Sequence, residues 1–222
     1  MHKENTSPLV SIIIPCYNYG QFIEQCVNSA LNQVYKNIEV IVVDNGSTDD
    51  SLKKINTFSH DKRVKIIKLD KNIFPGSQTE SAIGIAIKKS SGEYISILYA
   101  DDWYLPTKIE KQVDLFNKSH SSVGVVYCHG YRYFEKDKTK IEFKQQSVRG
   151  YVFKDYLTEG DVVIPISPLV KRCCYEIIGL NNLWTGSEYD FFMMSQYVDF
   201  DYVDENLVVM RMHNNNDAKQ GL

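Results

Sequence analysis

The sequence predicts an α/β fold: a mostly parallel sheet with helices on both faces, merged with a smaller, mixed second half. Three observations predict it. Short β-branched apolar segments alternate with amphipathic segments up to about Lys118, each apolar segment ends in a polar cluster, and the alternation stops beyond Cys128. Strands that alternate with helices pair in parallel through right-handed crossovers.

The first elements are two strands with a helix between them. Residues 10–14 and 38–43 are continuous apolar runs, which indicate strands buried on both faces. Residues 19–33 carry apolar side chains at helical spacing. The alternation continues with a helix near residues 50–58, a strand over 64–69, a helix over 76–89, a strand over 94–99 and a helix over 106–118.

The second half is predicted to be mixed rather than parallel. A strand over 123–128 comes first, and strands at 131–134 and 141–143 then flank a charged turn at 136–140, as in a hairpin. An extended segment over 162–170, a helix over 172–178 ended by Gly179, a helix over 188–198 and a strand over 207–212 follow. The polar tail, 214–222, is expected to be loose.

Composition limits the class of protein. A chain of 222 residues with 43% hydrophobic residues can bury one substantial core, so we expect a single domain over 1–222. The 25 basic and 28 acidic residues are interspersed, which argues against a nucleic-acid partner. Five scattered cysteines predict a reduced, cytoplasmic chain. No apolar run approaches the ~20 residues that span a bilayer, so any membrane contact is expected to be peripheral.

Polar clusters follow four predicted strands, at residues 15–18, 44–49, 70–72 and 100–102. Ligands of open parallel sheets bind beyond the carboxyl ends of the strands, so these clusters predict one binding rim. The glycine-rich phosphate fingerprints are absent. A carboxylate pair such as Asp101 and Asp102 can instead hold a hard divalent cation that accepts phosphate oxygens. The rim therefore predicts a diphosphate site.

Each cluster also has a purely structural explanation. Residues 44–49 can form a tight turn in which Thr48 or Asp49 caps the next helix, and Asp101-Asp102 before Pro106 can be a capping turn. Tyr17 can be an ordinary surface aromatic residue.

Several motifs in order resemble glycosyltransferase family 2: Val-Ser-Ile-Ile-Ile-Pro-Cys-Tyr-Asn at 10–18, Leu-Asn-Gln at 31–33, Ile-Val-Val-Asp-Asn-Gly-Ser-Thr-Asp at 41–49, Ser-Gly-Glu-Tyr at 91–94 and Tyr-Ala-Asp-Asp-Trp at 99–103. Residues 169–179, 186–194 and 210–214 resemble it more thinly. The resemblance implies a GT-A fold, with a Rossmann-like nucleotide-sugar half over about 8–120 and an acceptor half over about 121–213. It also implies inverting chemistry with Mn²⁺ or Mg²⁺.

The resemblance assigns donor-site roles to matching residues. Pro15 and Tyr17 would line the base pocket, while Asp44 and Asn45 would address the base or the ribose. The usual second acid of that turn is Asn45 here. Uridine is the favoured nucleoside, and thymidine and guanosine stay open.

The resemblance also assigns the metal and diphosphate contacts. Asp102 would coordinate the metal, and Asp101 would contact the metal or the ribose. His213 would meet the metal or the diphosphate, with Arg211 as a diphosphate partner. The commonly seen acid two positions before Asp101 is Tyr99 here, and the family's Arg and Asn on the helix after the third strand are missing from residues 78–82.

Inversion needs a base on the acceptor side, because the acceptor hydroxyl attacks opposite the departing diphosphate. The family places an acid at the start of a late helix, before a run that matches residues 189–193 here, so Glu188 is the expected base. Asp190 is the rival, and it points to a different face of a helix. An acid in a first helical turn is also explained by the helix dipole alone.

These observations favour an inverting glycosyltransferase that uses a nucleoside-diphosphate sugar and a saccharide or lipid-linked saccharide acceptor, in polysaccharide or glycoconjugate synthesis. A sugar nucleotidyltransferase is a second hypothesis, but it would want a basic, glycine-rich loop where residues 15–18 stand. A third is a non-catalytic scaffold subunit, suggested by Asn45 and Tyr99. The retained Asp101, Asp102 and Glu188 argue against it.

Overall fold

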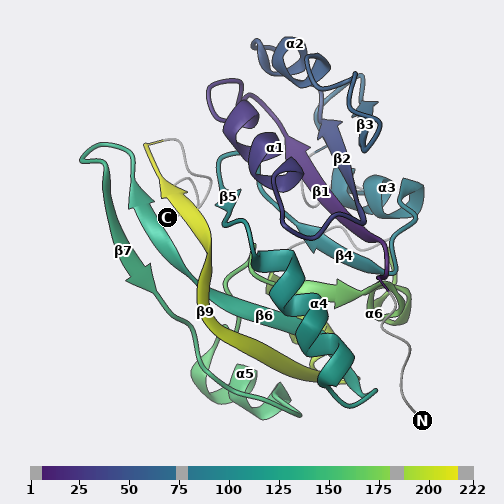
Figure 1. Cartoon of the computed structure of the whole chain (residues 1–222), viewed down its shortest axis with the longest axis vertical. Coiled ribbons are helices and arrows are strands. Elements are labelled where there is room, and N and C mark those ends of the chain that lie inside the picture. Colours follow the sequence, from purple (N-terminus) through teal and green to yellow (C-terminus); the bar gives the residue numbers. More distant parts are fainter. Residues whose placement is uncertain (1–6, 74–79, 181–187, 215–222) are drawn as a thin grey trace.

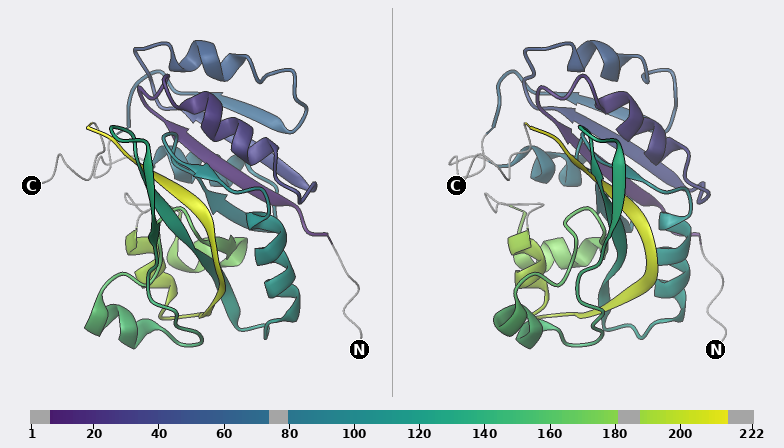
Figure 2. Two further views of the ribbon diagram at one scale, coloured as in Figure 1. Left: turned by 60° about the vertical axis from the view of Figure 1, so that its left-hand side comes forward. Right: turned by 90° about the vertical axis from the view of Figure 1, so that its left-hand side faces the viewer.

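The computed structural model describes residues 7–73, 80–180 and 188–214. Within these residues, one nine-stranded sheet runs through the whole molecule in the order β3-β2-β1-β4-β8-β6-β9-β5, with β7 paired to β6 (Figure 1). Helices cover both faces of this sheet (Figure 2). The predicted α/β architecture is therefore confirmed.

The first half forms a parallel sheet. β1 (Val10–Cys16) lies between β2 (Ile38–Asp44) and β4 (Tyr94–Ile97), and β3 (Val64–Lys68) forms the outer strand. The connecting helices are α1 (Ile23–Leu31), α2 (Ser51–Asn56) and α3 (Ala82–Lys89). Each element lies at the predicted stretch, and some are shorter than expected. α1 begins at Ile23 because a turn precedes it, and β4 ends at Ile97 rather than 99. α3 begins at Ala82, since the Ser81 side chain caps it, and 76–79 lie outside the described residues.

The second half is mixed, as predicted. It contains β5 (Trp103–Tyr104), α4 (Lys108–Lys118), β6 (Val123–Phe134), β7 (Thr139–Phe143), α5 (Phe153–Glu159), β8 (Leu169–Lys171), α6 (Arg172–Ile178), α7 (Glu188–Met194) and β9 (Asp199–Met212). β8 is antiparallel to β4 and β6, whereas β9 runs parallel to β6. The β6–β7 hairpin is confirmed.

Four predictions for this half are wrong. The strands expected over 123–128 and 131–134 are one continuous strand, β6. The extended segment expected over 162–170 is a strand only from Leu169, because Ser167 closes a turn onto the Ile164 carbonyl and Pro165 and Pro168 have no N–H for a ladder. α7 ends at Met194 rather than near 198. β9 begins at Asp199 rather than 207, since β6 supplies its hydrogen bonds over the whole length.

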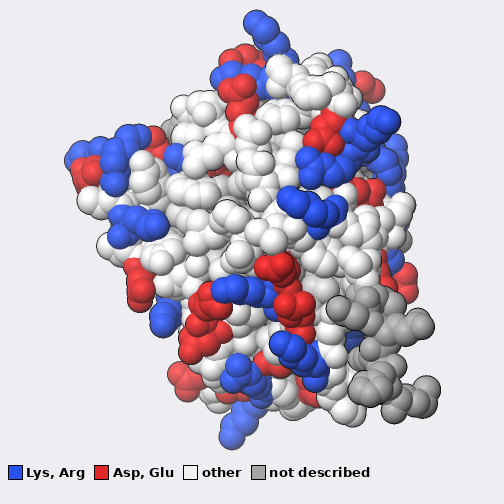
Figure 3. Space-filling view, viewed as in Figure 1, with Lys and Arg blue, Asp and Glu red and all other residues white. Residues whose placement is uncertain are grey.

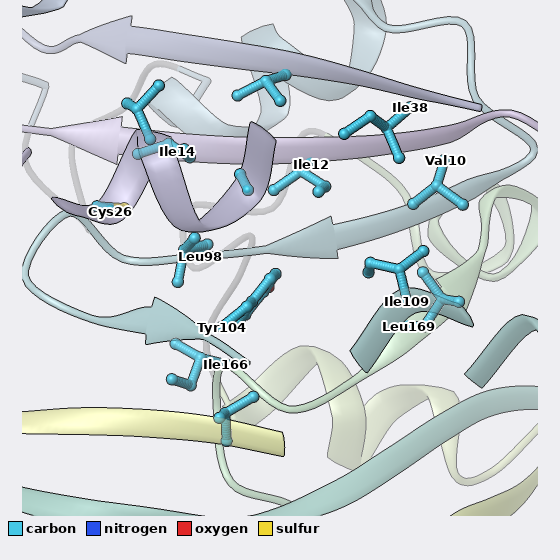
Figure 4. Close-up of a cluster of buried hydrophobic side chains, with 14 of the residues drawn as sticks. Val10, Ile12, Ile14, Cys26, Ile38, Leu98, Tyr104, Ile109, Ile166 and Leu169 are labelled. Atoms are coloured by element: carbon cyan, nitrogen blue, oxygen red, sulfur yellow. The ribbon is translucent and has the colours of Figure 1, made fainter. Parts of the chain in front are cut away.

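The core has two layers, one on each face of the sheet. Successive residues of β1 alternate between them: Ile12 and Ile14 face the layer covered by α1 and α4, and Ile13 faces the layer covered by α3, α6 and α7. Figure 4 shows the first layer, in which Ile12 and Ile14 lie near Leu98 and Tyr104. Strands buried on both faces explain the continuous apolar runs in the sequence.

Charged side chains of both signs are spread over the surface seen in Figure 3. Among the described residues, no helix is both long enough and apolar enough to span a membrane.

Candidate functional site

The loops after β1 and β2 are joined through Asn18. Its Oδ1 accepts hydrogen bonds from the backbone N–H of Thr48 at 2.8 Å and of Asp49 at 3.3 Å, and its own N–H donates to Ser47 Oγ at 3.1 Å. Asn18 adopts φ 57°, a left-handed conformation that asparagine tolerates well. This bridge fixes the spacing of the two loops at the carboxyl edge of the sheet.

Asp49 has a structural role, in agreement with the explanation of residues 44–49 as a turn that leads into the next helix. Its carboxylate accepts from Ser51 N–H at 2.9 Å at the start of α2 and from Gly20 N–H at 3.0 Å. Burial raises the pKa of Asp49, but these hydrogen bonds outweigh it and the net pKa is lowered. Asp49 therefore remains ionised and braces the β1 loop.

Between these braces lie the predicted base-pocket residues. Asp44 is buried at the end of β2, where it accepts from Ser47 N–H at 3.3 Å. Tyr17 is 37% exposed, so its ring can meet a ligand, and Pro15 is partly exposed. Their contacts with a nucleotide remain predictions.

Asn45 is tied to the segment that follows β3. Its Nδ2 donates to Asn72 Oδ1 at 2.7 Å, and its Oδ1 accepts from Ile73 N–H at 2.9 Å. Gly46 completes this contact, because a Cβ there would lie 2.5 Å from the Lys71 backbone and its φ is +73°. The amide at position 45 thus positions a neighbouring loop, and base recognition by it would compete with these bonds.

The Asp101–Asp102 pair lies just beyond β4, in a turn closed by a 3.0 Å hydrogen bond from Asp102 N–H to the Tyr99 carbonyl. Both residues are buried, with 8% and 5% of their surface exposed. Burial and the neighbouring Asp101 charge raise the pKa of Asp102 well above its usual value. Two adjacent buried carboxylates favour a cation, and their oxygens are the ligands that Mn²⁺ and Mg²⁺ accept.

His213 contacts this pair. Its Nε2 lies 3.0 Å from Asp101 Oδ2, and its ring packs against Phe22 at 4.9 Å and Tyr19 at 5.8 Å between centroids. The contact joins an imidazole to one carboxylate of the pair, and both are ligand types that divalent metals accept. Within 7–73, 80–180 and 188–214, no cluster of three or more His, Cys, Asp or Glu side chains has metal-binding geometry.

Arg211 is buried next to the carboxylates. Its backbone N–H donates to Asp102 Oδ1 at 2.7 Å, and its Nε donates to the Asp101 carbonyl at 2.8 Å. Its remaining nitrogens bond to Glu135 and, at 2.6 Å, to Gln25 Oε1. The guanidinium also lies 4.4 to 4.7 Å from the Phe22 and Trp103 ring centroids.

These contacts make Arg211 a brace for the Asp101–Asp102 turn. Sequence reasoning named Arg211 but missed Gln25, Glu135 and Phe22. No sequence signal could have found them, since up to 186 residues separate them from Arg211.

The two candidate bases differ in burial. Glu188 is exposed at the start of α7, while Asp190 is fully buried. Both act on Tyr99: burial raises the pKa of this phenol far above its usual value, and the charges of Glu188, Asp190, Asp102 and Asp101 add to the effect in that order. The charges of the α7 acids and of the Asp101–Asp102 pair therefore all act on one tyrosine.

Comparison with solved structures identifies the fold class of this chain. Staphylococcus aureus TarS, solved in complex with UDP-GlcNAc, matches 96% of this chain and 61% of that chain, with TM-score 0.70 and 15% identity. A mannosyltransferase from Pyrobaculum calidifontis, solved with GDP-Man and Mn²⁺, matches 97% of this chain and 60% of that chain, with TM-score 0.69 and 16% identity. The chain has the GT-A fold.

Sequence comparison gives the family. The model of glycosyl transferase family 2 matches residues 11–168, and an uncharacterized glycosyltransferase of Rickettsia typhi is 35% identical over 224 residues. This alignment covers 95% of this chain but 66% of the relative. The chain belongs to glycosyl transferase family 2.

Proposed function

We propose that this protein is an inverting glycosyltransferase that moves a sugar from a nucleoside-diphosphate sugar to an acceptor hydroxyl. The proposal is supported by the buried Asp101–Asp102 pair beyond β4 and by the charges of this pair and of the α7 acids, which all act on Tyr99. Donor and acceptor groups of a transferase must meet at one point, and in this proposal the donor-side and acceptor-side acids would meet near Tyr99.

The donor half, residues 8–120, would bind the nucleotide at the joined loops after β1 and β2. The ring of Tyr17 would stack on the base beside Pro15, and Asp44 and Asn45 would offer hydrogen bonds to the base or ribose. A UDP-sugar is the favoured donor, which agrees with the UDP-GlcNAc complex of TarS.

A divalent metal, Mn²⁺ or Mg²⁺, would be held by Asp102 with Asp101 and His213. Its chemistry there is to neutralise the charge that develops on the departing diphosphate. Arg211 would add positive charge nearby and, through its bonds to the Asp101–Asp102 turn, would keep the carboxylates in place.

The acceptor half, residues 121–213, would present Glu188 to the acceptor. Inversion requires the hydroxyl to attack the anomeric carbon on the side opposite the diphosphate, and Glu188 would take its proton during the attack. An exposed carboxylate can be reached by an incoming acceptor, whereas Asp190 is sealed in the protein. Asp190 therefore fits a role in positioning α7.

The acceptor would be a saccharide or a lipid-linked saccharide, in polysaccharide or glycoconjugate synthesis. We place the reaction in the cytoplasm, with peripheral contact at the inner face of the membrane for a lipid-linked acceptor. The surface charges, mixed in sign, offer no continuous basic track for nucleic acid on the face in view (Figure 3).

Calorimetry tests the donor site directly. UDP, GDP and dTDP are titrated into the purified protein with and without Mn²⁺, and UDP is expected to bind most tightly and only with metal. Equal, weak heats for all three nucleotides would refute the proposal. Measuring the slow hydrolysis of UDP-sugars then separates an enzyme from a non-catalytic scaffold, which would bind UDP without releasing sugar.

A further inference from the structure

A row of aromatic side chains leads away from Glu188 across α7 and α5. Phe192 lies one turn beyond Glu188, on the same side of α7, because residues four apart share a face of a helix. The Phe192 ring packs against Phe153 of α5 at 5.5 Å between centroids, and Phe153 contacts Tyr151 at 6.3 Å. We call Phe192, Phe153 and Tyr151 the aromatic track.

The track becomes more exposed with distance from the base. Phe192 and Phe153 are half-buried, and Tyr151 has 60% of its surface exposed. Tyr189, next to Glu188, is 49% exposed. The core explains the inner side of the track, where Phe192 meets Tyr156 at 6.0 Å, but it does not explain why large rings continue outward into solvent.

We propose that the aromatic track is a binding subsite for the acceptor, and that the acceptor is an oligosaccharide whose further sugar rings stack on Phe192, Phe153 and Tyr151. This inference rests on the proposed function, because it takes Glu188 as the base. It goes beyond that function by assigning the surface that binds the acceptor and the acceptor's minimum length: at least two sugar rings.

The chemistry of the track favours a saccharide over other partners. A pyranose has an apolar face of C–H groups that packs on a flat ring, and hydroxyls at its edge that need hydrogen-bond partners. Tyr151 offers both a ring and a hydroxyl, and exposed Lys154 and partly exposed Asp155 follow on α5. Neighbouring ring centroids along the track are 5.5 Å and 6.3 Å apart. This spacing suits an extended chain in which one sugar unit stacks on each ring.

Continuity with the base provides the second argument. An acceptor whose terminal hydroxyl reaches Glu188 must leave the site over some surface of the protein. The face of α7 that carries Glu188 continues directly into Phe192 and the α5 rings. The track therefore lies along a route that the rest of the acceptor would follow.

The test uses the whole chain with UDP and Mn²⁺ on an array of immobilised glycans from one to six sugars. Binding is expected for glycans of at least two rings and weaker or absent for the matching monosaccharide. Tyr151→Ala should weaken oligosaccharide binding about three- to tenfold, the loss expected for one aromatic contact. It should leave the affinities for UDP and for the monosaccharide unchanged.

Two controls make the result specific. Tyr197→Ala removes an equally exposed tyrosine, 59% exposed, which lies beyond the end of α7, and should not change binding. Tyr151→Phe keeps the ring and should retain most of the affinity. Light scattering on the same variants reports self-association.

Three outcomes would overturn the inference: no glycan binds while UDP does, Tyr151→Ala and Tyr197→Ala behave alike, or Tyr151→Ala abolishes self-association instead of glycan binding. Failure of UDP itself to bind would be a different result, because it would refute the proposed function at the donor site.

Discussion

Replacing each of the two acids of α7 by its amide should have different effects on activity. Glu188→Gln keeps the size and hydrogen bonding of the side chain but removes its basicity. If Glu188 is the base, kcat should fall by roughly 10²-fold or more, which corresponds to a barrier about 2.7 kcal/mol higher. Asp190→Asn should change kcat much less.

Stability should rank the two variants the other way: Asp190→Asn should lose more stability than Glu188→Gln. Glu188 is exposed, so Glu188→Gln should alter the free energy of unfolding by no more than about 0.5 kcal/mol. Asp190 is fully buried, so Asp190→Asn replaces a carboxylate by an amide at a position that water does not reach. A mismatched buried group costs about 1–3 kcal/mol, which lowers Tm by about 2–12 °C in a chain of this size.

The assay combines sugar transfer, thermal unfolding and UDP affinity for both variants. We expect an inactive, stable Glu188→Gln and an active, less stable Asp190→Asn, both of which bind UDP like the wild type. The reverse activities, with UDP binding intact in both, would identify Asp190 as the base and show that the register of the late helix was misassigned.

Three further predictions concern the donor site and the core. Asp102→Asn should abolish transfer and remove the Mn²⁺ dependence of UDP binding in calorimetry, and an unchanged metal dependence would refute the assignment. Tyr17→Ala should weaken UDP, GDP and dTDP by similar factors, because stacking tolerates any base; a loss confined to one nucleotide would contradict this. Burial lowers the pKa of Lys108 to about 7, so the unfolded chain binds the extra proton between about pH 7 and pH 10. The wild type should therefore gain stability relative to Lys108→Met over this range, and a Tm difference that is independent of pH would refute the shift.

The sequence predicted the first half of the fold well because burial there is regular. Strands covered on both faces need continuous apolar runs, and each run in β1, β2 and β4 is long enough to recognise. α5 and β5 were missed, since a seven-residue helix and a two-residue strand leave almost no periodicity. The charged start of β9 was missed as well, because its pairing to β6 does not depend on apolar side chains.

In the candidate site, too, some features could be predicted from the sequence and others could not. Asp44 ends β2, and Asp101 and Asp102 come shortly after β4, so their place at the edge of the sheet could be predicted from the chain alone. The bonds that commit Asn45 to Asn72 and Ile73 could not, because they depend on how the segment after β3 folds back. A sequence pattern names residue types, but it does not show which side chains are already occupied by the protein.

β9 shows why the two halves act as one unit. It is paired with β6 of the second half of the chain, yet its end brings Arg211 and His213 against the Asp101–Asp102 turn, which follows β4 of the first half. Arg211 also bonds to Gln25 of α1 and to Glu135 beyond β6, so its buried guanidinium links these two segments to the backbone of the Asp101–Asp102 turn. A shift of the β6–β9 pair on acceptor binding would therefore be transmitted to the proposed metal ligands through bonds that already exist. Donor and acceptor sites would then be coupled by the geometry of a single strand.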